Sequence, residues 1–138
     1  MIYAAIDTNV FVSAFITNNK KAATSLVFQH LLAGEVTPLY NDEILAEYKE
    51  VLSRKKFHLP EETIEDFLGT IKERGIHEDR TPFAEAMPDE DDRVFLEISL
   101  SREDSFLVTG NLKHYPKLPE VVTPAEFVSR FFGEQSRE

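Results

Sequence analysis

The sequence predicts an α/β fold in which helices cover both faces of a central, mostly parallel sheet. Short apolar runs, which are typical of strands buried on both faces, alternate along the chain with longer segments whose apolar residues recur at helical spacing. The chain has 138 residues, of which 42% are hydrophobic, so its length is that of one domain. It contains no cysteine, which excludes a disulfide scaffold, a thiolate zinc site and a cysteine nucleophile.

Five elements are expected in the N-terminal part of the chain. In order they are a strand over 2–6, helices over 10–16 and 22–33, a strand over 36–40 and a helix over 42–54. Asn9 is the expected cap of the first helix, and Asn41 or Asp42 that of the third. Gly34 ends the second helix, because glycine adopts the left-handed backbone that terminates helices. Pro38 cannot donate a hydrogen bond within a sheet, so we expect the second strand to be very short or at an edge.

The next two elements are helices separated by an acidic segment. The first opens at Pro60, whose ring suits the start of a helix, and ends at Gly75. The second is strongly apolar and is expected to start near Asp91 or Asp92 and to continue to Leu100. Two short strands, over 106–109 and 121–122, follow.

The last helix has the clearest start signal in the chain. Thr123 and Glu126 form a capping box, and Pro124 occupies the first helical position, so a helix through Phe132 is expected. Residues 1–132 are therefore predicted to form one domain, and residues 133–138 a frayed tail.

The charge balance restricts the ligands that the protein can bind. There are 15 Lys and Arg against 25 Asp and Glu, a formal net charge of −10 at pH 7. This is the wrong sign for binding nucleic acid by phosphate neutralisation alone, so a polyanionic ligand would need another source of positive charge. Seven acids lie between Glu78 and Asp92 against the single Arg80, a run that is usually a solvated loop.

The apolar N-terminus predicts neither a signal peptide nor a membrane span. Residues 1–16 are interrupted by Asp7 and Asn9 and carry no basic leader. We therefore expect a cytoplasmic protein that does not contact membranes.

Several polar side chains are predicted to meet at one edge of the sheet. Asp7 follows the first strand directly, and Asn111 follows the strand at 106–109. The carboxyl ends of strands in an open parallel sheet form its ligand-binding edge. Asp92 at the start of one helix and Glu47 within another can reach the same edge. Carboxylates that converge without a basic partner favour a hard divalent cation, Mg²⁺ or Mn²⁺, which would supply the positive charge for hydrolysing a phosphodiester.

Four sequence motifs strengthen this interpretation. They are Ile-Asp-Thr-Asn-Val-Phe-Val-Ser at 6–13, Ile-Leu-Ala-Glu-Tyr-Lys-Glu-Val-Leu at 44–52, Pro-Asp-Glu-Asp-Asp-Arg-Val-Phe-Leu-Glu at 88–97 and Leu-Val-Thr-Gly-Asn at 107–111. In this order they resemble the motifs of the PIN-domain ribonucleases, most of all the VapC-like toxins of prokaryotic toxin–antitoxin systems. The resemblance covers nearly the whole chain and implies a PIN-like three-layer α/β/α sandwich.

The resemblance also implies a reaction and a set of site residues. Members of this family cleave RNA with Mg²⁺ or Mn²⁺ bound to the acids of the motifs. The implied catalytic residues and metal ligands are Asp7, Glu47 and Asp92, and the implied supporting residues are Asn9 and Thr109. A cognate antitoxin protein and a homodimer are the partners that the resemblance implies, besides RNA.

The sequence departs from the family pattern at Asn111, where many members carry a fourth acid. An amide oxygen can still bind a metal or a water, but one negative charge is lost, which favours one bound ion over two. This departure keeps open an alternative function, a catalytically weak or inactive PIN-like module that binds RNA or protein. Asp91 competes with Asp92 as the ligand. Asp7 and Asp92 could also be simple helix caps, and Glu47 half of an exposed ion pair.

Two basic segments are candidates for contact with RNA. Arg54, Lys55 and Lys56 belong to the only dense basic run, which could equally complement the dipole at a helix end. Lys113 and His114 follow the turn at the predicted ligand-binding edge and could touch phosphate. A receiver domain that accepts phosphate on aspartate is disfavoured, because that fold needs paired acids where Asp7 is followed by Thr8.

Overall fold

The computed structural model of the protein describes residues 1–136 and contains one sheet of five parallel strands. In spatial order β3-β2-β1-β4-β5, the strands are β3 Ile76–His77, β2 Val36–Tyr40, β1 Ile2–Ile6, β4 Ser105–Val108 and β5 Val121–Val122. The predicted α/β class with a parallel sheet is therefore confirmed.

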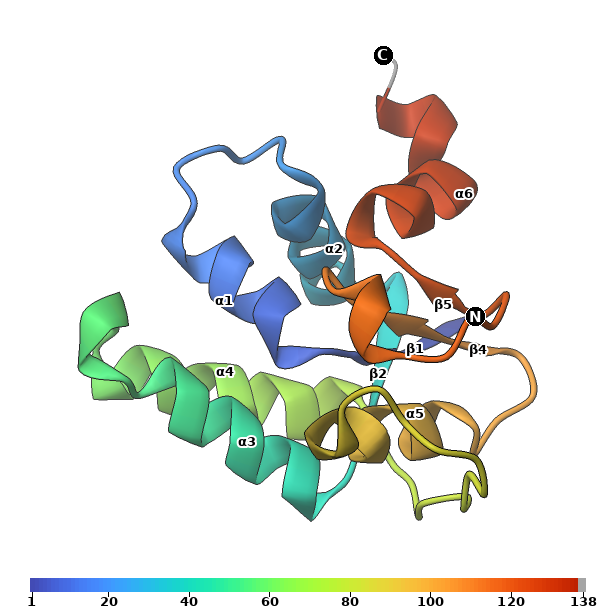
Figure 1. Ribbon diagram of the computed structural model, residues 1–138. Coiled ribbons are helices and arrows are strands. Elements are labelled where there is room, and N and C mark those ends of the chain that lie inside the picture. Colours follow the sequence, from blue (N-terminus) through green and yellow to red (C-terminus); the bar gives the residue numbers. More distant parts are fainter. Residues whose placement is uncertain (137–138) are drawn as a thin grey trace.

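Helices cover both faces of the sheet and complete a three-layer sandwich (Figure 1). The α-helices are α1 Thr8–Ile16, α2 Ala23–Leu32, α3 Asp42–Leu52, α4 Glu61–Arg74, α5 Arg93–Ser99 and α6 Pro124–Ser136. Helices α2 and α6 lie on one side of the sheet, and α3, α4 and α5 lie on the other (Figure 1). Three short 3₁₀ helices are η1 Lys55–Phe57, η2 Glu90–Asp92 and η3 Leu112–His114.

A cluster of aromatic rings connects α1 to α3 and α4. The ring of Phe11 packs edge-to-face on Phe67 at 4.7 Å and on Tyr48 at 5.2 Å. Truncating a fully buried ring of this kind costs about 3–5 kcal/mol of stability. The Tyr48 hydroxyl also donates to the carbonyl oxygen of Ile6 at 2.5 Å. This bond fixes α3 against the end of β1. Asp7, which follows Ile6, and Glu47, which precedes Tyr48, are therefore held close to each other.

The prediction that the second strand is very short or lies at an edge was wrong, since β2 has five residues and is an inner strand. Strand β2 pairs with β1 on one side and with β3 on the other, and β3 is an edge strand that the sequence did not reveal. Pairing with β3 begins at Leu39, one residue after Pro38. A Cβ atom on Gly75 would lie 2.5 Å from the carbonyl oxygen of Pro38, so only glycine lets the chain pass from α4 into β3.

The structure also settles where the helices start. Helix α1 begins at Thr8, so Asn9 lies inside it and is not its cap. Asn41 is the cap of α3, because its side chain accepts from the N–H of Ile44 at 2.9 Å. Asp92 occupies the cap position of α5 without a capping hydrogen bond, since the 3₁₀ turn η2 precedes that helix.

At the C-terminus the predicted capping box is confirmed, with reciprocal hydrogen bonds of 2.9 and 3.1 Å between Thr123 and Glu126. Helix α6 continues to Ser136, so the segment expected to fray, residues 133–138, is helical up to that residue. Residues 137 and 138 lie outside the described part of the chain. Within residues 1–136, none of the helices combines the length and the apolar character that crossing a membrane requires.

Candidate functional site

Asp7 is the buried centre of the edge formed by the carboxyl ends of the strands. It follows β1, is 4% exposed, and its Oδ2 accepts from the hydroxyls of Thr109 at 2.8 Å and Tyr115 at 2.9 Å. Although Asp7 occupies the cap position of α1, its side chain makes no capping hydrogen bond. The carboxylate is therefore oriented by two long-range donors instead of serving the helix that follows it.

Glu47 reaches this edge from α3. Its Oε2 accepts a short hydrogen bond from the hydroxyl of Thr8, the first residue of α1, and the side chain is half-buried. The neighbouring Tyr48 is anchored on Ile6, which keeps α3 against the end of β1. Glu47 consequently faces the sheet edge next to Asp7 and does not form the exposed ion pair that the sequence left as an alternative.

Asp92 forms the third acidic corner together with His114. The Oδ2 atom of Asp92 lies 2.9 Å from Nδ1 of His114, which is also 3.7 Å from Oδ2 of Asp89. Single ligand atoms of Asp89, Asp92 and His114 all lie within 4.8 Å of one another, a spacing that could hold a metal ion. Asp91 is exposed, which favours Asp92 in the competition between the two.

The electrostatics of the three acids show that their negative charge is poorly compensated. Burial raises the pKa of Asp7, although the hydrogen bonds from Thr109 and Tyr115 oppose this. Burial also raises the pKa of Glu47, with further repulsion from Asp7, Asp92 and Asp91. The pKa of Asp92 is raised to about 6 by burial and by repulsion from Asp7, against the hydrogen bond of His114. The mutual repulsion places all three carboxylates within electrostatic reach of one another.

Asn9 and Thr109, the residues predicted to support the site, both form hydrogen bonds with the turn after β4. The Thr109 hydroxyl donates to Asp7 and accepts from the N–H of Asn111 at 3.0 Å. The N–H of Gly110 donates to Oδ1 of Asn9 at 2.9 Å, which ties this turn to α1. Asn111 itself is exposed at the surface of the turn. The turn therefore aligns Asp7, and Asn111, at the position of the expected fourth acid, is solvent-exposed on the same turn.

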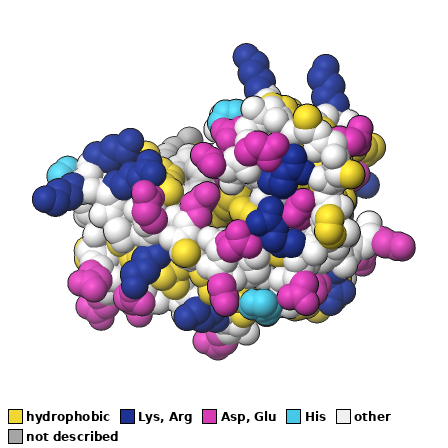
Figure 2. All heavy atoms as spheres, turned by 60° about the horizontal axis from the view of Figure 1, so that its bottom comes forward, with side chains coloured by type: hydrophobic (Ala, Val, Ile, Leu, Met, Phe, Trp, Pro, Cys, Tyr) yellow, Lys and Arg dark blue, Asp and Glu magenta, His cyan; other side chains and the backbone are white. Residues whose placement is uncertain are grey.

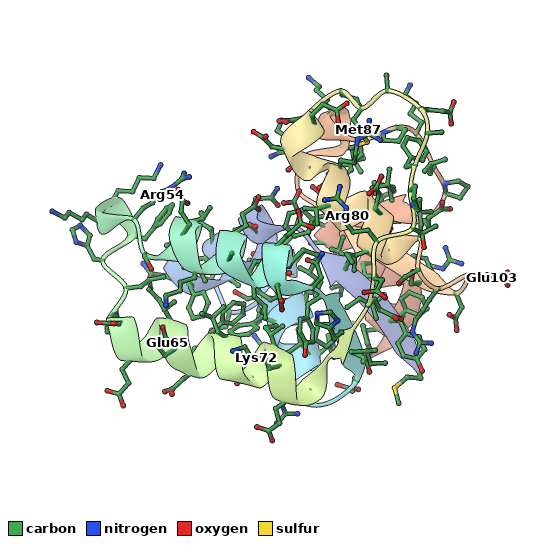
Figure 3. All side chains as sticks on the ribbon, turned by 90° about the horizontal axis from the view of Figure 1, so that it is seen from below. Arg54, Glu65, Lys72, Arg80, Met87 and Glu103 are labelled. Atoms are coloured by element: carbon green, nitrogen blue, oxygen red, sulfur yellow. The ribbon has the colours of Figure 1, made fainter. Side chains whose placement is uncertain are left out.

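The acidic segment 78–92 is held in place by arginines and is not a simple solvated loop. Arg80 joins Glu43 of α3 at 2.9 Å to the buried Glu97 of α5 at 2.7 Å, and Figure 3 shows it between these two helices. Arg93 donates to the carbonyl oxygens of Phe83 and Glu85 and to the carboxylate of Glu90. These contacts fix the backbone that leads to Asp92.

The predicted basic run lies away from the acidic edge. Arg54 pairs with Glu50 at 3.0 Å at the far end of α3, and Figure 3 shows it at the tip of the helical pair α3 and α4. Lys55 and Lys56 are exposed in η1, which follows α3. Figure 2 shows Lys and Arg side chains gathered at this left-hand end of the molecule. Lys113, in contrast, is exposed on η3 beside His114, at the site itself.

Sequence reasoning missed two residues of the site. Thr8 and Tyr115 orient Glu47 and Asp7. The one available signal for Tyr115 was its place in the segment that follows the turn after β4. The hydrogen bond of Tyr115 spans 108 positions, and such a contact leaves no local pattern.

Most of the chain is similar to one known protein family. The family model described as PIN domain matches residues 3–113, which include the three acids and all but Tyr115 and His114 of the side chains that bond to them. A search of curated proteins found no match for the chain.

Proposed function

The chain belongs to the PIN-domain family, and we propose on this basis that it is a divalent-metal-dependent endoribonuclease. Proteins of this family are typically metal-dependent nucleases. The observation that carries the proposal is the convergence of Asp7, Glu47 and Asp92 at one edge, each with a raised pKa. Within residues 1–136 no Lys or Arg pairs with any of the three, so a cation from solution is what the site needs.

The donor set fits Mg²⁺ or Mn²⁺. Both ions prefer oxygen ligands, and the three carboxylates supply them, with Asn111 as a further oxygen on the turn. A bound ion of this type lowers the pKa of a coordinated water and neutralises phosphate charge. One ion accounts for the acids that converge, and Asn111 leaves a second ion without the charge that a fourth acid would bring.

The chain's own residues then have separable roles. Asp7, Glu47 and Asp92 would hold the ion, while Thr109 and Tyr115 fix one oxygen of Asp7 and so orient the carboxylate. Such partners of ligands typically change metal affinity by 10- to 100-fold when they are mutated. His114 holds Asp92 in the same way, since its Nδ1 lies at hydrogen-bond distance from Oδ2.

Asp7→Asn tests the proposal. The amide keeps an oxygen that can accept from Thr109 and Tyr115, so the fold should persist, whereas the charge of the ligand is lost. We expect Mn²⁺-dependent cleavage of RNA to fall on the order of a hundredfold or more. Asp104→Asn is the matched control, because Asp104 is exposed at the opposite end of β4. Unchanged cleavage by a folded Asp7→Asn protein would contradict the assignment.

We further propose that the protein acts in the cytoplasm as a homodimeric toxin whose partner is an antitoxin protein. The support is the likeness of the four sequence motifs to VapC-like toxins. Induced expression should then arrest bacterial growth, and Asp7→Asn should remove the arrest. Growth that continues unimpeded during expression of an active nuclease would contradict the toxin role and leave the nuclease proposal intact.

A second candidate function is a weakly active or inactive module that binds RNA or protein. The exposed Asn111 favours it, because the turn presents an amide where many family members have an acid. The two candidates differ in one result: the module binds RNA in the presence of Mn²⁺ without cleaving it, and Asp7→Asn leaves that binding unchanged.

A further inference from the structure

The segment between β4 and β5 lines an open cavity near the sheet edge that carries Asp7, Glu47 and Asp92. Its volume is about 660 Å³, which lies within the range of small-ligand pockets. Most of its wall is apolar and includes Leu112, Pro116 and Leu118, with Lys113 and Lys117 as its charged members. Such a wall can accommodate a flat apolar group and a nearby anion at the same time.

One residue, Tyr115, belongs both to the wall of the cavity and to the candidate active site. Tyr115 lines the cavity, and its hydroxyl donates to Oδ2 of Asp7 at 2.9 Å. The preceding residue, His114, contacts Asp92 at 2.9 Å. A molecule in the cavity would therefore lie across the Tyr115 side chain from Asp7.

The charge of the cavity is opposite to that of the chain. Among the described residues, none that lines it is acidic, although the chain has 25 acids against 15 bases. Lys113 and Lys117 are exposed, and within residues 1–136 neither takes part in an ion pair. Two free ammonium groups beside an apolar wall complement a nucleotide, which has an apolar base face and an anionic phosphate.

We infer that this cavity receives a nucleobase of the RNA next to the scissile phosphate, with Lys113 and Lys117 on the flanking phosphates. The inference rests on the proposed ribonuclease function and deepens it, because it assigns a base-binding subsite to the segment 112–121. Leu112, Pro116 and Leu118 contact the base through its faces, so the subsite holds bases by apolar contact and selects single-stranded RNA, whose bases are free to enter.

The test separates base contacts from phosphate contacts. Binding is measured by fluorescence anisotropy in Ca²⁺, which occupies oxygen sites, and gel electrophoresis of each sample confirms that the RNA is intact. The probes are a short single-stranded RNA of mixed sequence and an abasic ribose–phosphate chain of equal length and charge. The wild type should bind the RNA about tenfold more tightly than the abasic chain, the effect of burying roughly 60 Å² of a base against an apolar wall at about 25 cal/mol per Å².

Three variants carry the comparison. Leu112 is 43% exposed, so Leu112→Ala should fold and should lose most of the preference for RNA over the abasic chain. Lys117→Ala should weaken both probes alike and reduce the slope of log Kd against log salt by about one. Lys72→Ala, on α4 as Figure 3 shows, is the matched control and should change neither. Melting temperatures of all variants confirm that they are folded.

The outcomes distinguish this inference from the function on which it rests. If Leu112→Ala weakens the two probes equally, or if the wild type binds both equally, the cavity is not a base subsite. Equal RNA binding by all variants would show that neither the cavity nor Lys117 contacts RNA. Cleavage of the RNA by wild type in Mn²⁺ is measured in parallel. Cleavage together with either of these binding results would overturn the subsite alone, whereas a wild type that binds but never cleaves would overturn the nuclease.

Discussion

Tyr115→Phe removes one hydroxyl from the site and leaves the packing of the ring unchanged. In the structure this hydroxyl and that of Thr109 are the two side-chain donors to Oδ2 of the buried Asp7. A hydrogen bond to a charged group contributes about 1.5–3 kcal/mol, and the phenyl ring creates no cavity. We therefore expect the metal-free variant to be less stable by about 2 kcal/mol, a decrease in Tm of about 6 °C for a chain of this length.

The same substitution should weaken metal binding. Without the Tyr115 donor, the pKa of Asp7 rises further and the carboxylate is less firmly oriented, so protons compete better with the ion. Loss of an orienting partner typically weakens metal affinity about tenfold or more. Differential scanning calorimetry in chelator measures the stability of the metal-free variant. Calorimetric titration with Mn²⁺ at neutral pH measures its metal affinity.

Tyr3→Phe is the control for this experiment. Tyr3 lies on β1, and its ring packs under the guanidinium of Arg102 at 4.3 Å, a contact that phenylalanine preserves. This variant should match the wild type in Mn²⁺ affinity. Two results would refute the reasoning: Tyr115→Phe also retains wild-type stability and Mn²⁺ affinity, or the two variants lose equal amounts of stability and affinity. In either case the hydroxyl of Tyr115 does not position Asp7.

Two further predictions concern charge at the same edge. The pKa of Asp92 is raised to about 6 in the folded protein, from an ordinary value of 3.8, so the folded state binds the proton more tightly. The Tm in chelator should therefore decrease as pH rises from about 4 to about 6, more steeply for the wild type than for Asp92→Asn, and parallel curves would show that Asp92 is not the responsible group. Asn111→Asp should tighten Mn²⁺ binding and lower the Tm in chelator, because a further carboxylate adds repulsion that only the ion relieves. Equal Mn²⁺ affinity and equal Tm for Asn111→Asp and wild type would mean that this side chain points away from the ion.

Local sequence patterns predicted the elements of this fold well, and they predicted pairing partners poorly. Apolar spacing and caps placed the helices because both signals lie within a few residues, as at Asn41 and in the box of Thr123 and Glu126. The edge strand β3 has only two residues, too few to show any periodicity. Asn9 was misassigned as a cap because asparagine favours caps, whereas here its oxygen accepts from Gly110, 101 positions away.

The same contrast applies to the candidate site: residues with a local sequence signal were predictable, and residues whose partners depend on the tertiary fold were not. Asp7, Glu47 and Asp92 were predictable because each stands at a strand end or on a helix beside an apolar stripe, where an ionised side chain needs an explanation. Thr8 and Tyr115 were not predictable, since a hydroxyl is compatible with many environments and its partner here is set by the tertiary fold.

The central claim is that a divalent ion binds where these acids converge. Its most direct test is anomalous scattering from crystals soaked in Mn²⁺. The account predicts one strong manganese peak in contact with Asp7 and Asp92, on the side of the edge that faces Glu47, and its absence from crystals of Asp7→Asn. A peak confined to another part of the surface, or an edge without manganese at saturating concentrations, would contradict it.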